Sequence, residues 1–279
     1  MPPHAEMLKG CRHPAQIEGL LALADQALRT WEPRWSAFLA AEVREEAEAV
    51  LGGLSELRLS SDGGYPGAER RRLRMQRAET ADTGAGRDAD TDVDANTDAD
   101  ADAAANAELS GLEISGNFLF DPAEAGDIRQ ALQALGAEEG QLGDVWIRGD
   151  RGAQAIVSAA LARRLDGGEA QVRTVPVRIE ARPIAELQLP AARTPRRLSS
   201  VEASRRLDAV ASAGFGLSRS RMAALIRQGA VRIDWQPVSS PSRELAVGER
   251  VQVQGRGELE ILSIEPTKRE RLRIAMERR

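Results

Sequence analysis

The 279-residue sequence is poor in cysteine, histidine and aromatic residues, with one Cys, two His and 3% aromatics. The single Cys11 excludes a disulfide framework and any site built from several thiolates, and His4 and His13 are too few for a histidine-rich metal centre. No apolar run approaches the ~18 residues needed to span a bilayer, and the N-terminus lacks the hydrophobic core of a signal peptide. We therefore expect a soluble, cytoplasmic protein of about two domains with no metal or other cofactor.

Charge is divided by segment along the chain. The net charge is −5, but residues 82–108 contain eight Asp, one Glu and one Arg, a local balance of −8. Residues 193–279 carry eighteen Lys or Arg against ten Asp or Glu, a balance of +8. The basic C-terminal segment is expected to attract a polyanion such as a nucleic acid.

The N-terminal region, residues 1–80, combines helices with extended segments. Apolar residues recur every three or four positions before Pro33, which is typical of an amphipathic helix. In chain order the region predicts two helices, a strand, a tight turn and a basic strand or helix, over residues 14–31, 38–51, 56–60, 63–67 and 70–77.

The segment 81–108 is an acidic insertion, built almost wholly of Asp, Ala, Thr, Gly and Asn. Such a composition does not form a core, so we expect disorder. Its alternating aspartates resemble a calcium loop, but Val93 or Thr97 stands where that loop requires Gly. Weak, nonspecific cation binding remains the alternative.

Residues 109–181 are expected to form an ordered middle domain. In chain order it predicts strand, helix, strand, helix and strand, over residues 112–120, 122–135, 144–148, 153–165 and 172–179. This alternation indicates a compact α+β sandwich with helices on one face of the sheet. Residues 182–197, with three prolines, are interpreted as a linker.

The C-terminal domain, residues 198–279, predicts two helices and a small sheet. Ser199 and Glu202 have the spacing of a capping box, so a helix is expected from Ser199 to Gly214. Ser218 is expected to cap a second helix that stops at Gly229. A turn at 235–237 and strands at 231–234, 250–253 and 259–261, with a hairpin at 255–257, complete the prediction.

Several short motifs of this domain resemble the small RNA-binding module named after small-subunit ribosomal protein S-four. The resemblance rests on Arg206-Leu207-Asp208, Gly214-Phe215, Ser218-Arg219-Ser220-Arg221, Leu225-Ile226, Gly229, Val231-Arg232-Ile233, Pro241-Ser242 and Gly248. It implies two helices packed on a small sheet (an αL-like domain), with Arg and Ser at the second helix N-terminus facing RNA. The turn Asp234-Trp235-Gln236 departs from the Asn-Gly-Lys type common in the family.

The physical chemistry of these residues agrees with RNA binding. A helix N-terminus presents free N–H groups and a positive dipole end to a phosphate, and arginine adds forked donors. Each arginine has a solvated or salt-bridged surface role as its alternative. Asp208 is expected to orient a neighbouring arginine or to cap structure rather than to touch RNA. Trp235 either stacks on a base or packs in the core. The candidate RNA-binding residues are Arg206, Asp208, Ser218, Arg219, Ser220, Arg221, Arg227, Arg232, Asp234, Trp235 and Gln236.

Motifs outside this domain resemble the YlmH-like family, especially its cyanobacterial and plastid branch of photosystem II S-four domain proteins. They are Gly63-Gly64-Tyr65-Pro66, Glu69-Arg70, Gly116-Asn117-Phe118, Gly143-Asp144, Arg151-Gly152-Ala153-Gln154 and residues 171–176. The resemblance implies a ribosome-associated RNA-binding protein with an RRM-like middle domain. The photosystem label implies only a genetic or phylogenetic association.

Convergent catalytic groups are missing from the sequence, which favours a non-catalytic, α+β RNA-binding protein. The expected partner is structured ribosomal RNA or tRNA on the large ribosomal subunit. The expected location is the cytoplasm or a plastid stroma. The sequence does not choose between a role in ribosome assembly and one in translation quality control. One alternative is an RNA-modifying enzyme of the pseudouridine-synthase type, with Asp121 or Asp144 as the catalytic residue. Another is a photosystem assembly or scaffold factor.

Overall fold

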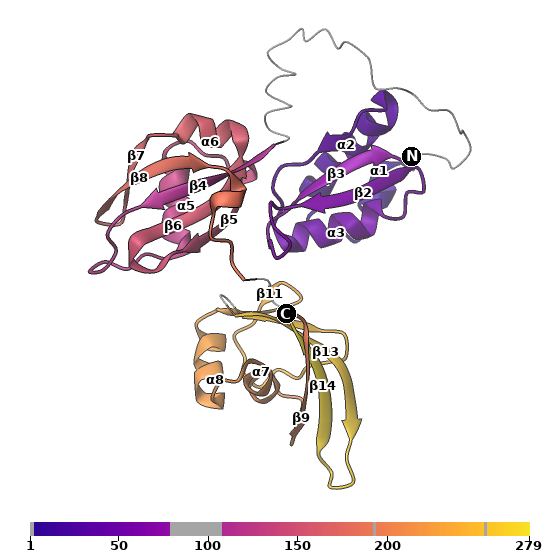
Figure 1. The fold of residues 1–279 in the computed structure, drawn as a ribbon. Coiled ribbons are helices and arrows are strands. Elements are labelled where there is room, and N and C mark those ends of the chain that lie inside the picture. The colour runs from indigo at the N-terminus through magenta and orange to yellow at the C-terminus, as the bar shows by residue number, and fades with distance from the viewer. Residues whose placement is uncertain (1–2, 79–107, 192–193, 254–255) are drawn as a thin grey trace. The chain divides into compact units, whose positions relative to one another are not determined.

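The structure is a computed structural model that describes residues 3–78, 108–191, 194–253 and 256–279 (Figure 1). The chain divides into an N-terminal unit, Met1–Ala191, and a C-terminal unit, Ala192–Arg279. The predicted acidic insertion lies outside the described residues, apart from Glu108. Among the helices that the structure describes, none is long and apolar enough to cross a membrane.

The first part of the N-terminal unit is a three-stranded antiparallel sheet with helices on one face (Figure 1). The buried side of α2 carries Ile17, Leu21 and Ala24, which pack with Leu51 of α3 and Met75 of β3. The basic segment after the turn is therefore a strand. The elements are α1 (His4–Met7), α2 (Pro14–Thr30), β1 (Arg34–Trp35), α3 (Ala41–Leu51), β2 (Leu57–Asp62) and β3 (Arg72–Arg77), with sheet order β1-β3-β2.

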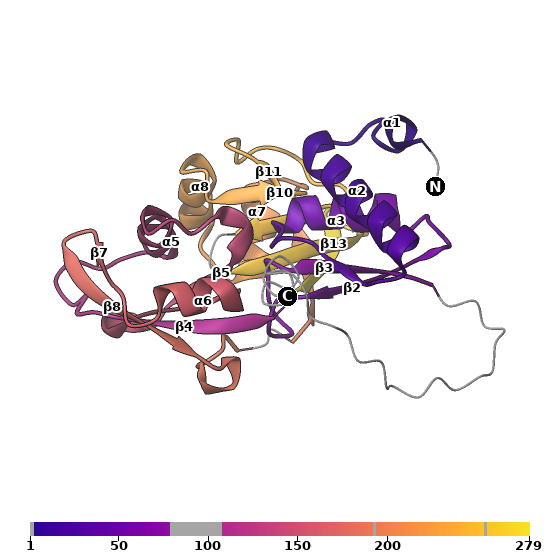
Figure 2. The same ribbon diagram turned by 90° about the horizontal axis from the view of Figure 1, so that it is seen from above.

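The second part of the N-terminal unit is a five-stranded antiparallel sheet in the order β5-β6-β4-β8-β7. Both of its longer helices cover the same face (Figure 2). Without β7, the chain order β-α-β-β-α-β and the sheet order are those of an RRM, as the resemblance implies. The elements are β4 (Leu109–Ser115), α5 (Ala125–Ala134), η1 (Glu139–Gln141), β5 (Leu142–Ile147), η2 (Gly149–Arg151), β6 (Gly152–Ser158), α6 (Ala159–Leu165), β7 (Glu169–Val172), β8 (Val175–Arg182) and η3 (Ile184–Glu186).

Two predictions for this sheet were wrong in their first part and right in their second. The predicted helix at 153–165 is strand β6 followed by α6, because every residue of β6 is buried and small residues there fit between two covered faces. The predicted strand at 172–179 is the β7–β8 hairpin, whose turn places Arg173 at φ +55°.

The sheet face opposite α5 and α6 is also covered. The segment after β8, predicted as a linker, folds back so that Leu187 lies directly against Gly111 of β4, where even a Cβ atom would come within 2.6 Å of it. Leu187 and Phe38 bury Ile156 of β6 from this side. An RRM stacks bases on aromatic side chains of its two central strands, but β4 and β6 have none. This face is therefore an internal interface and not a site for base stacking.

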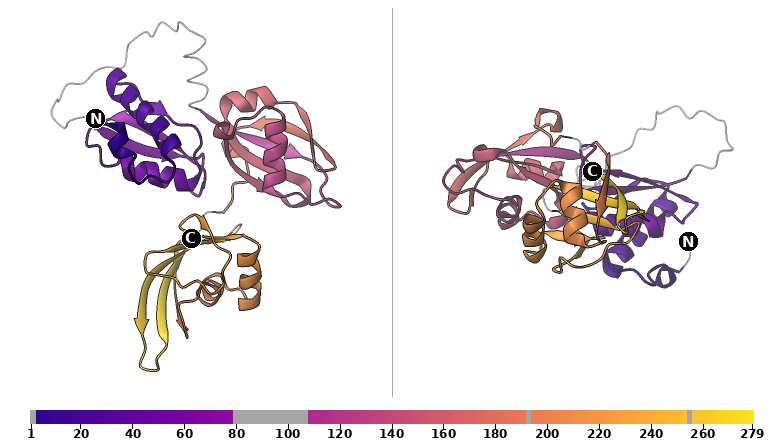
Figure 3. Two further views of the ribbon diagram at one scale, coloured as in Figure 1. Left: turned by 180° about the vertical axis from the view of Figure 1, so that it is seen from behind. Right: turned by 90° about the horizontal axis from the view of Figure 1, so that it is seen from below.

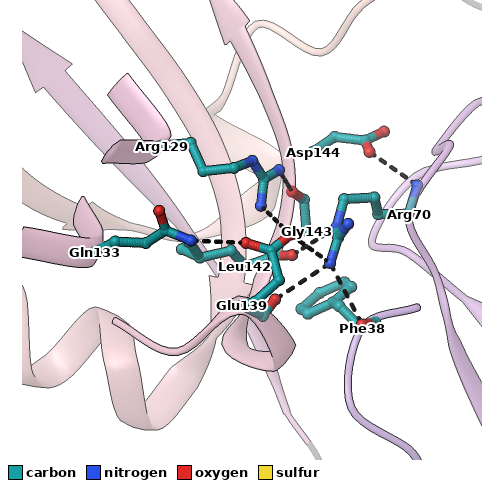
Figure 4. A network of polar contacts seen from close by, with 8 residues as sticks. All are labelled: Phe38, Arg70, Arg129, Gln133, Glu139, Leu142, Gly143 and Asp144. Atoms are coloured by element: carbon teal, nitrogen blue, oxygen red, sulfur yellow. Dashed lines mark hydrogen bonds and ion pairs between the residues drawn. The ribbon is translucent and has the colours of Figure 1, made fainter. Parts of the chain in front are cut away.

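A polar network joins the two parts of the N-terminal unit (Figure 4). Asp144 accepts hydrogen bonds from the Tyr65 hydroxyl (2.6 Å) and from the backbone N–H of Arg70 (2.9 Å). The Arg70 guanidinium donates to the carbonyl of Leu142 (2.9 Å) and pairs with Glu139 (3.0 Å). Burial, with a smaller contribution from the charge of Arg129, lowers the pKa of Arg70. Tyr65, Arg70 and Asp144, which belong to the motifs of the YlmH-like resemblance, thus have a structural role.

The C-terminal unit is a six-stranded antiparallel sheet with α7 and α8 packed on one face (Figures 1 and 3). Its core includes Val210, Met222, Val251, Leu259 and Ile274. The strand order is β11-β10-β12-β13-β14-β9. The elements are β9 (Arg196–Glu202), α7 (Leu207–Phe215), α8 (Arg219–Arg227), β10 (Val231–Ile233), β11 (Gln236–Pro237), β12 (Arg250–Val253), β13 (Gly257–Pro266) and β14 (Leu272–Arg278).

The helix predicted from Ser199 was wrong in its first half. Residues 196–202 form strand β9, which pairs with β14 along its whole length, and the helix begins only at Leu207 and ends one residue after Gly214. The second predicted helix is α8: Ser218 caps it, and Gly229 follows with φ +76°. The β10–β11 turn falls on Asp234 and Trp235, one residue before the predicted position.

Candidate nucleic-acid interface

The N-terminus of α8 is capped by Ser218, whose hydroxyl accepts a hydrogen bond from the backbone N–H of Arg221 (3.3 Å). The hydroxyls of Ser218 and Ser220 also lie 3.2 Å apart. Met222 and Ile226 turn the other side of the helix into the core. Local sequence thus fixes a nine-residue helix whose positive end and first turn face outward.

Asp208 holds two of the candidate arginines together. Arg206 and Arg219 each bind its carboxylate with two nitrogens, at 3.1 and 3.2 Å for Arg206 and at 3.0 and 3.2 Å for Arg219. Burial alone would raise the pKa of Asp208, but the hydrogen bonds from both arginines outweigh it and lower that pKa. The predicted orienting role of Asp208 agrees with this geometry.

Both arginines keep donors for another ligand. A guanidinium has five N–H donors, and each of these two uses only Nε and Nη2 on Asp208. The side chains of Arg206 and Arg219 remain 39% and 56% exposed, against 8% for Asp208. The buried carboxylate therefore fixes the orientation of both guanidinium groups and leaves their remaining N–H donors able to bind a phosphate.

Two further arginines of α8 extend this surface. Arg221 and Arg227 are exposed, and no acidic side chain in the described parts of the chain forms an ion pair with either. With Arg206, Asp208 and Arg219 they give a net charge of +3, from four arginines and one aspartate. We call these five residues the α7–α8 arginine surface.

Arg232 lies on the other side of the sheet. Its strand neighbours Val231 and Ile233 belong to the core beneath α7 and α8, and side chains alternate along a strand. The exposed Arg232 therefore points away from the helices, in register with Gln252 of β12. The prediction that Arg232 extends the helix surface was wrong, because sequence spacing gives no strand orientation before the core is known.

The turn residues Asp234, Trp235 and Gln236 form a separate feature. Asp234 and Trp235 both have positive φ, at 45° and 68°, as a two-residue hairpin turn requires. Trp235 is half-buried outside the helix-packed core, and the Arg250 guanidinium lies 5.8 Å from its ring centroid. A tryptophan is uncommon in this conformation, so the turn keeps an aromatic ring at some cost in backbone energy.

Pro241-Ser242 is one of the motifs that resemble the S-four module, but its role in fixing the start of α7 was not predicted. The backbone N–H of Leu207 donates to the carbonyl of Arg243 (2.7 Å), and that of Asp208 donates to the carbonyl of Pro241 (3.0 Å). The Arg243 guanidinium binds both carboxylate oxygens of Glu249, which raises the pKa of Arg243. The six-residue spacing of Arg243 and Glu249 across a turn was the available signal.

In the described residues, no three His, Cys, Asp or Glu side chains group together in a way that could hold a metal ion. Asp121 and Asp144, the two residues considered as catalytic, are both engaged. Asp121 accepts hydrogen bonds from Arg173 and Thr174, which lowers its pKa, and Asp144 accepts those of the network described above.

Replacing Asp208 with asparagine is expected to destabilise the C-terminal unit by about 1–2 kcal/mol at pH 7, because charged hydrogen bonds are lost and an NH₂ group would face guanidinium donors. The pKa of Asp208 is lower in the folded chain than in the unfolded chain. Its contribution is therefore complete above about pH 3.9 and is lost as the pH falls through the folded value. The difference in the free energy of urea unfolding between wild type and variant should therefore shrink as the pH falls. Glu270→Gln, which replaces an exposed carboxylate, is the control. An advantage unchanged at pH 2 would contradict this.

Comparisons with known proteins agree with this architecture. Residues 13–80 match the family "YlmH, N-terminal", and residues 205–251 match the "S4 domain". The chain carries a YlmH N-terminal domain and an S4 domain. Both resemblances seen in the sequence, to the YlmH-like family and to the S-four module, are thereby confirmed, and the S4 domain contains the α7–α8 arginine surface.

A curated relative is the "Ribosome-associated protein quality control protein P2" of Bacillus subtilis (strain 168), 30% identical over 149 residues. The match covers 53% of this chain and 57% of that protein. The solved structure "Cell division protein ylmH from Streptococcus pneumoniae" covers 63% of this chain and 94% of its own, with 16% identity and a TM-score of 0.44.

Proposed function

We propose that this chain is a non-catalytic RNA-binding protein that binds structured ribosomal RNA or ribosome-bound tRNA on the large ribosomal subunit. The observation that carries the proposal is the α7–α8 arginine surface inside the S4 domain. Arg206, Arg219 and Arg221 lie at the capped N-terminus of α8, and Arg227 ends the same helix, an arrangement suited to backbone phosphates. It acts in the cytoplasm or in a plastid stroma.

A role in ribosome-associated quality control is supported by the name of the Bacillus subtilis relative. The absence of stacking aromatics on the two central strands of the RRM-like sheet favours RNA contact by the C-terminal unit. The hydrogen bonds of Asp121 and Asp144 favour structural over catalytic roles for both residues.

Purification of the tagged chain from cells, with and without ribonuclease, tests this function. We expect large-subunit RNA and proteins to co-purify and to disappear on digestion, because the chain binds RNA phosphates. Crosslinking followed by sequencing should place the reads on large-subunit rRNA or tRNA. Protein partners that survive ribonuclease, without RNA crosslinks, would contradict the proposal and favour a scaffold role.

A further inference from the structure

A second basic surface lies at the tip of the β13–β14 hairpin, which extends beyond the rest of its sheet (Figure 1). An open hollow of about 720 Å³ lies there, beside the end of β9. Its lining consists of Val201, Glu265, Pro266, Thr267, Lys268, Arg269, Arg271 and Arg273. We call this set the hairpin-tip hollow.

Positive charge dominates the hairpin-tip hollow. Lys268, Arg269, Arg271 and Arg273 give four positive charges against the one negative charge of Glu265 in the lining. Glu270, in the same turn, adds a second carboxylate, so residues 265–273 carry a net charge of +2. All four basic residues are exposed, and none forms an ion pair with a residue that the structure describes. Four unpaired cations within one loop and strand repel one another, so a polyanionic ligand would relieve an existing electrostatic cost.

The loop that carries these charges is held in one shape. The backbone N–H and the hydroxyl of Thr267 both donate to the carbonyl of Arg271, at 2.7 and 3.0 Å. The backbone N–H of Arg271 donates back to the Thr267 hydroxyl at 3.2 Å. Lys268 and Arg269 therefore lie on a braced turn, which lowers the entropy cost of binding.

The hollow is separate from the α7–α8 arginine surface. Ile274 and Met276 of β14 face the helix-packed core, so Arg273 points to the helix-free face, where it pairs in register with Val201 of β9. Residues 265–273 also lie outside the span of the S4 domain, residues 205–251. The hairpin thus adds charge to the domain on a different side.

We infer that the hairpin-tip hollow is a second RNA-backbone site, which binds phosphates of the same RNA as the α7–α8 arginine surface or of a neighbouring strand; this rests on the proposed function. Several cations spread over a loop and a strand match a row of phosphates better than one small anion. The apolar lining is limited to Val201 and Pro266, too little to insert into a lipid surface. RNA is therefore favoured over a membrane.

The test uses the whole chain with Lys268→Gln, Arg269→Gln and Arg271→Gln combined, and filter binding of purified large-subunit rRNA over a salt series. We expect affinity to fall at least about tenfold at 0.1 M salt and the salt slope to fall by roughly 2, at 0.7 to 0.9 for each phosphate that is no longer bound. The Arg269→Lys, Arg271→Lys variant keeps the charge and should keep the slope. The control, Arg58→Gln with Arg151→Gln and Arg163→Gln, removes three exposed charges from the N-terminal unit.

Three results would separate the inference from the proposed function. If wild-type protein binds rRNA and the hairpin variant matches the control, the hairpin site is overturned and RNA binding stands. An rRNA affinity that falls only in the hairpin variant, with an unchanged thermal melt, supports the site. If wild-type protein fails to bind rRNA but binds phosphatidylglycerol vesicles through the hairpin, both proposals are overturned.

Discussion

Replacing Arg219 and Arg221 with alanine is expected to weaken the binding of structured RNA by roughly 1–3 kcal/mol, the scale of charge-assisted hydrogen bonds. The salt slope should fall by roughly 0.7 to 0.9 for each phosphate that these side chains neutralise. Both side chains project from the first turn of α8, and the Ser218 cap remains in the variant. The helix should persist, because alanine is a good helix former. Filter binding over a salt series and circular dichroism measure both effects.

Arg58→Ala combined with Arg163→Ala is the matched control for this variant. Both are exposed arginines of the N-terminal unit, outside the two proposed RNA-binding surfaces. We expect this control to change the affinity much less than the double substitution in α8 does. Equal reductions in the two variants would show that RNA binds by general charge attraction, and an intact salt slope in the double variant would refute the proposed surface.

Replacing Gly152 with alanine is expected to destabilise the N-terminal unit by about 3–5 kcal/mol. Gly152 opens the buried strand β6 with φ +134°, and a Cβ atom there would lie 1.9 Å from the carbonyl oxygen of Ile114. The backbone of β4 or β6 would have to move, which would disturb their pairing at the centre of the sheet. Hydrogen exchange of the β4 and β6 amides should show the reduced stability.

Gly149→Ala separates steric conflict from backbone conformation. Gly149 also has positive φ, at +66°, but no atom lies within 4 Å of its would-be Cβ. Alanine there should cost only about 1–2 kcal/mol, the penalty of the left-handed conformation. The C-terminal unit should keep its exchange protection in both variants. Similar destabilisation by Gly152→Ala and Gly149→Ala would show that the close approach to Ile114 is not decisive.

Local sequence signals were sufficient to predict helices whose first and last residues are marked by capping residues or proline. The second helix of the S4 domain is bounded by Ser218 and Gly229, and both residues act as predicted. The same holds for α2, which starts at Pro14 and has its apolar residues on one side. Caps and periodicity act within a few residues, so a single sequence reveals them.

Elements defined by distant partners were harder to predict. Strand β9 was missed because Ser199 and Glu202 imitate a capping box, whereas its pairing with β14 comes from residues about seventy or more positions away. The alternation of Leu272, Ile274 and Met276 with polar residues was a usable signal for β14. Strand β6 looked helical because alanine at buried positions fits either structure.

The candidate site was predictable in its residues and less so in its geometry. The arginines of α8 and the role of Asp208 followed from motif and charge. That Arg232 faces the other side of the sheet depends on which residues β10 buries against the helices. The charge of the β13–β14 hairpin was visible in residues 268–273, but its hollow needs the pairing of three strands.

The short connection between the units limits how far they separate. Eight residues lie between Leu187, which is buried in the N-terminal unit, and Arg196, the first residue of β9. Even a fully extended chain of this length spans only roughly 30 Å. If the C-terminal unit binds RNA as proposed, the N-terminal unit therefore meets that RNA at an effective concentration on the order of millimolar. A contact between the N-terminal unit and a ribosome would then add to the affinity of the whole chain, even where the isolated unit would bind too weakly to detect.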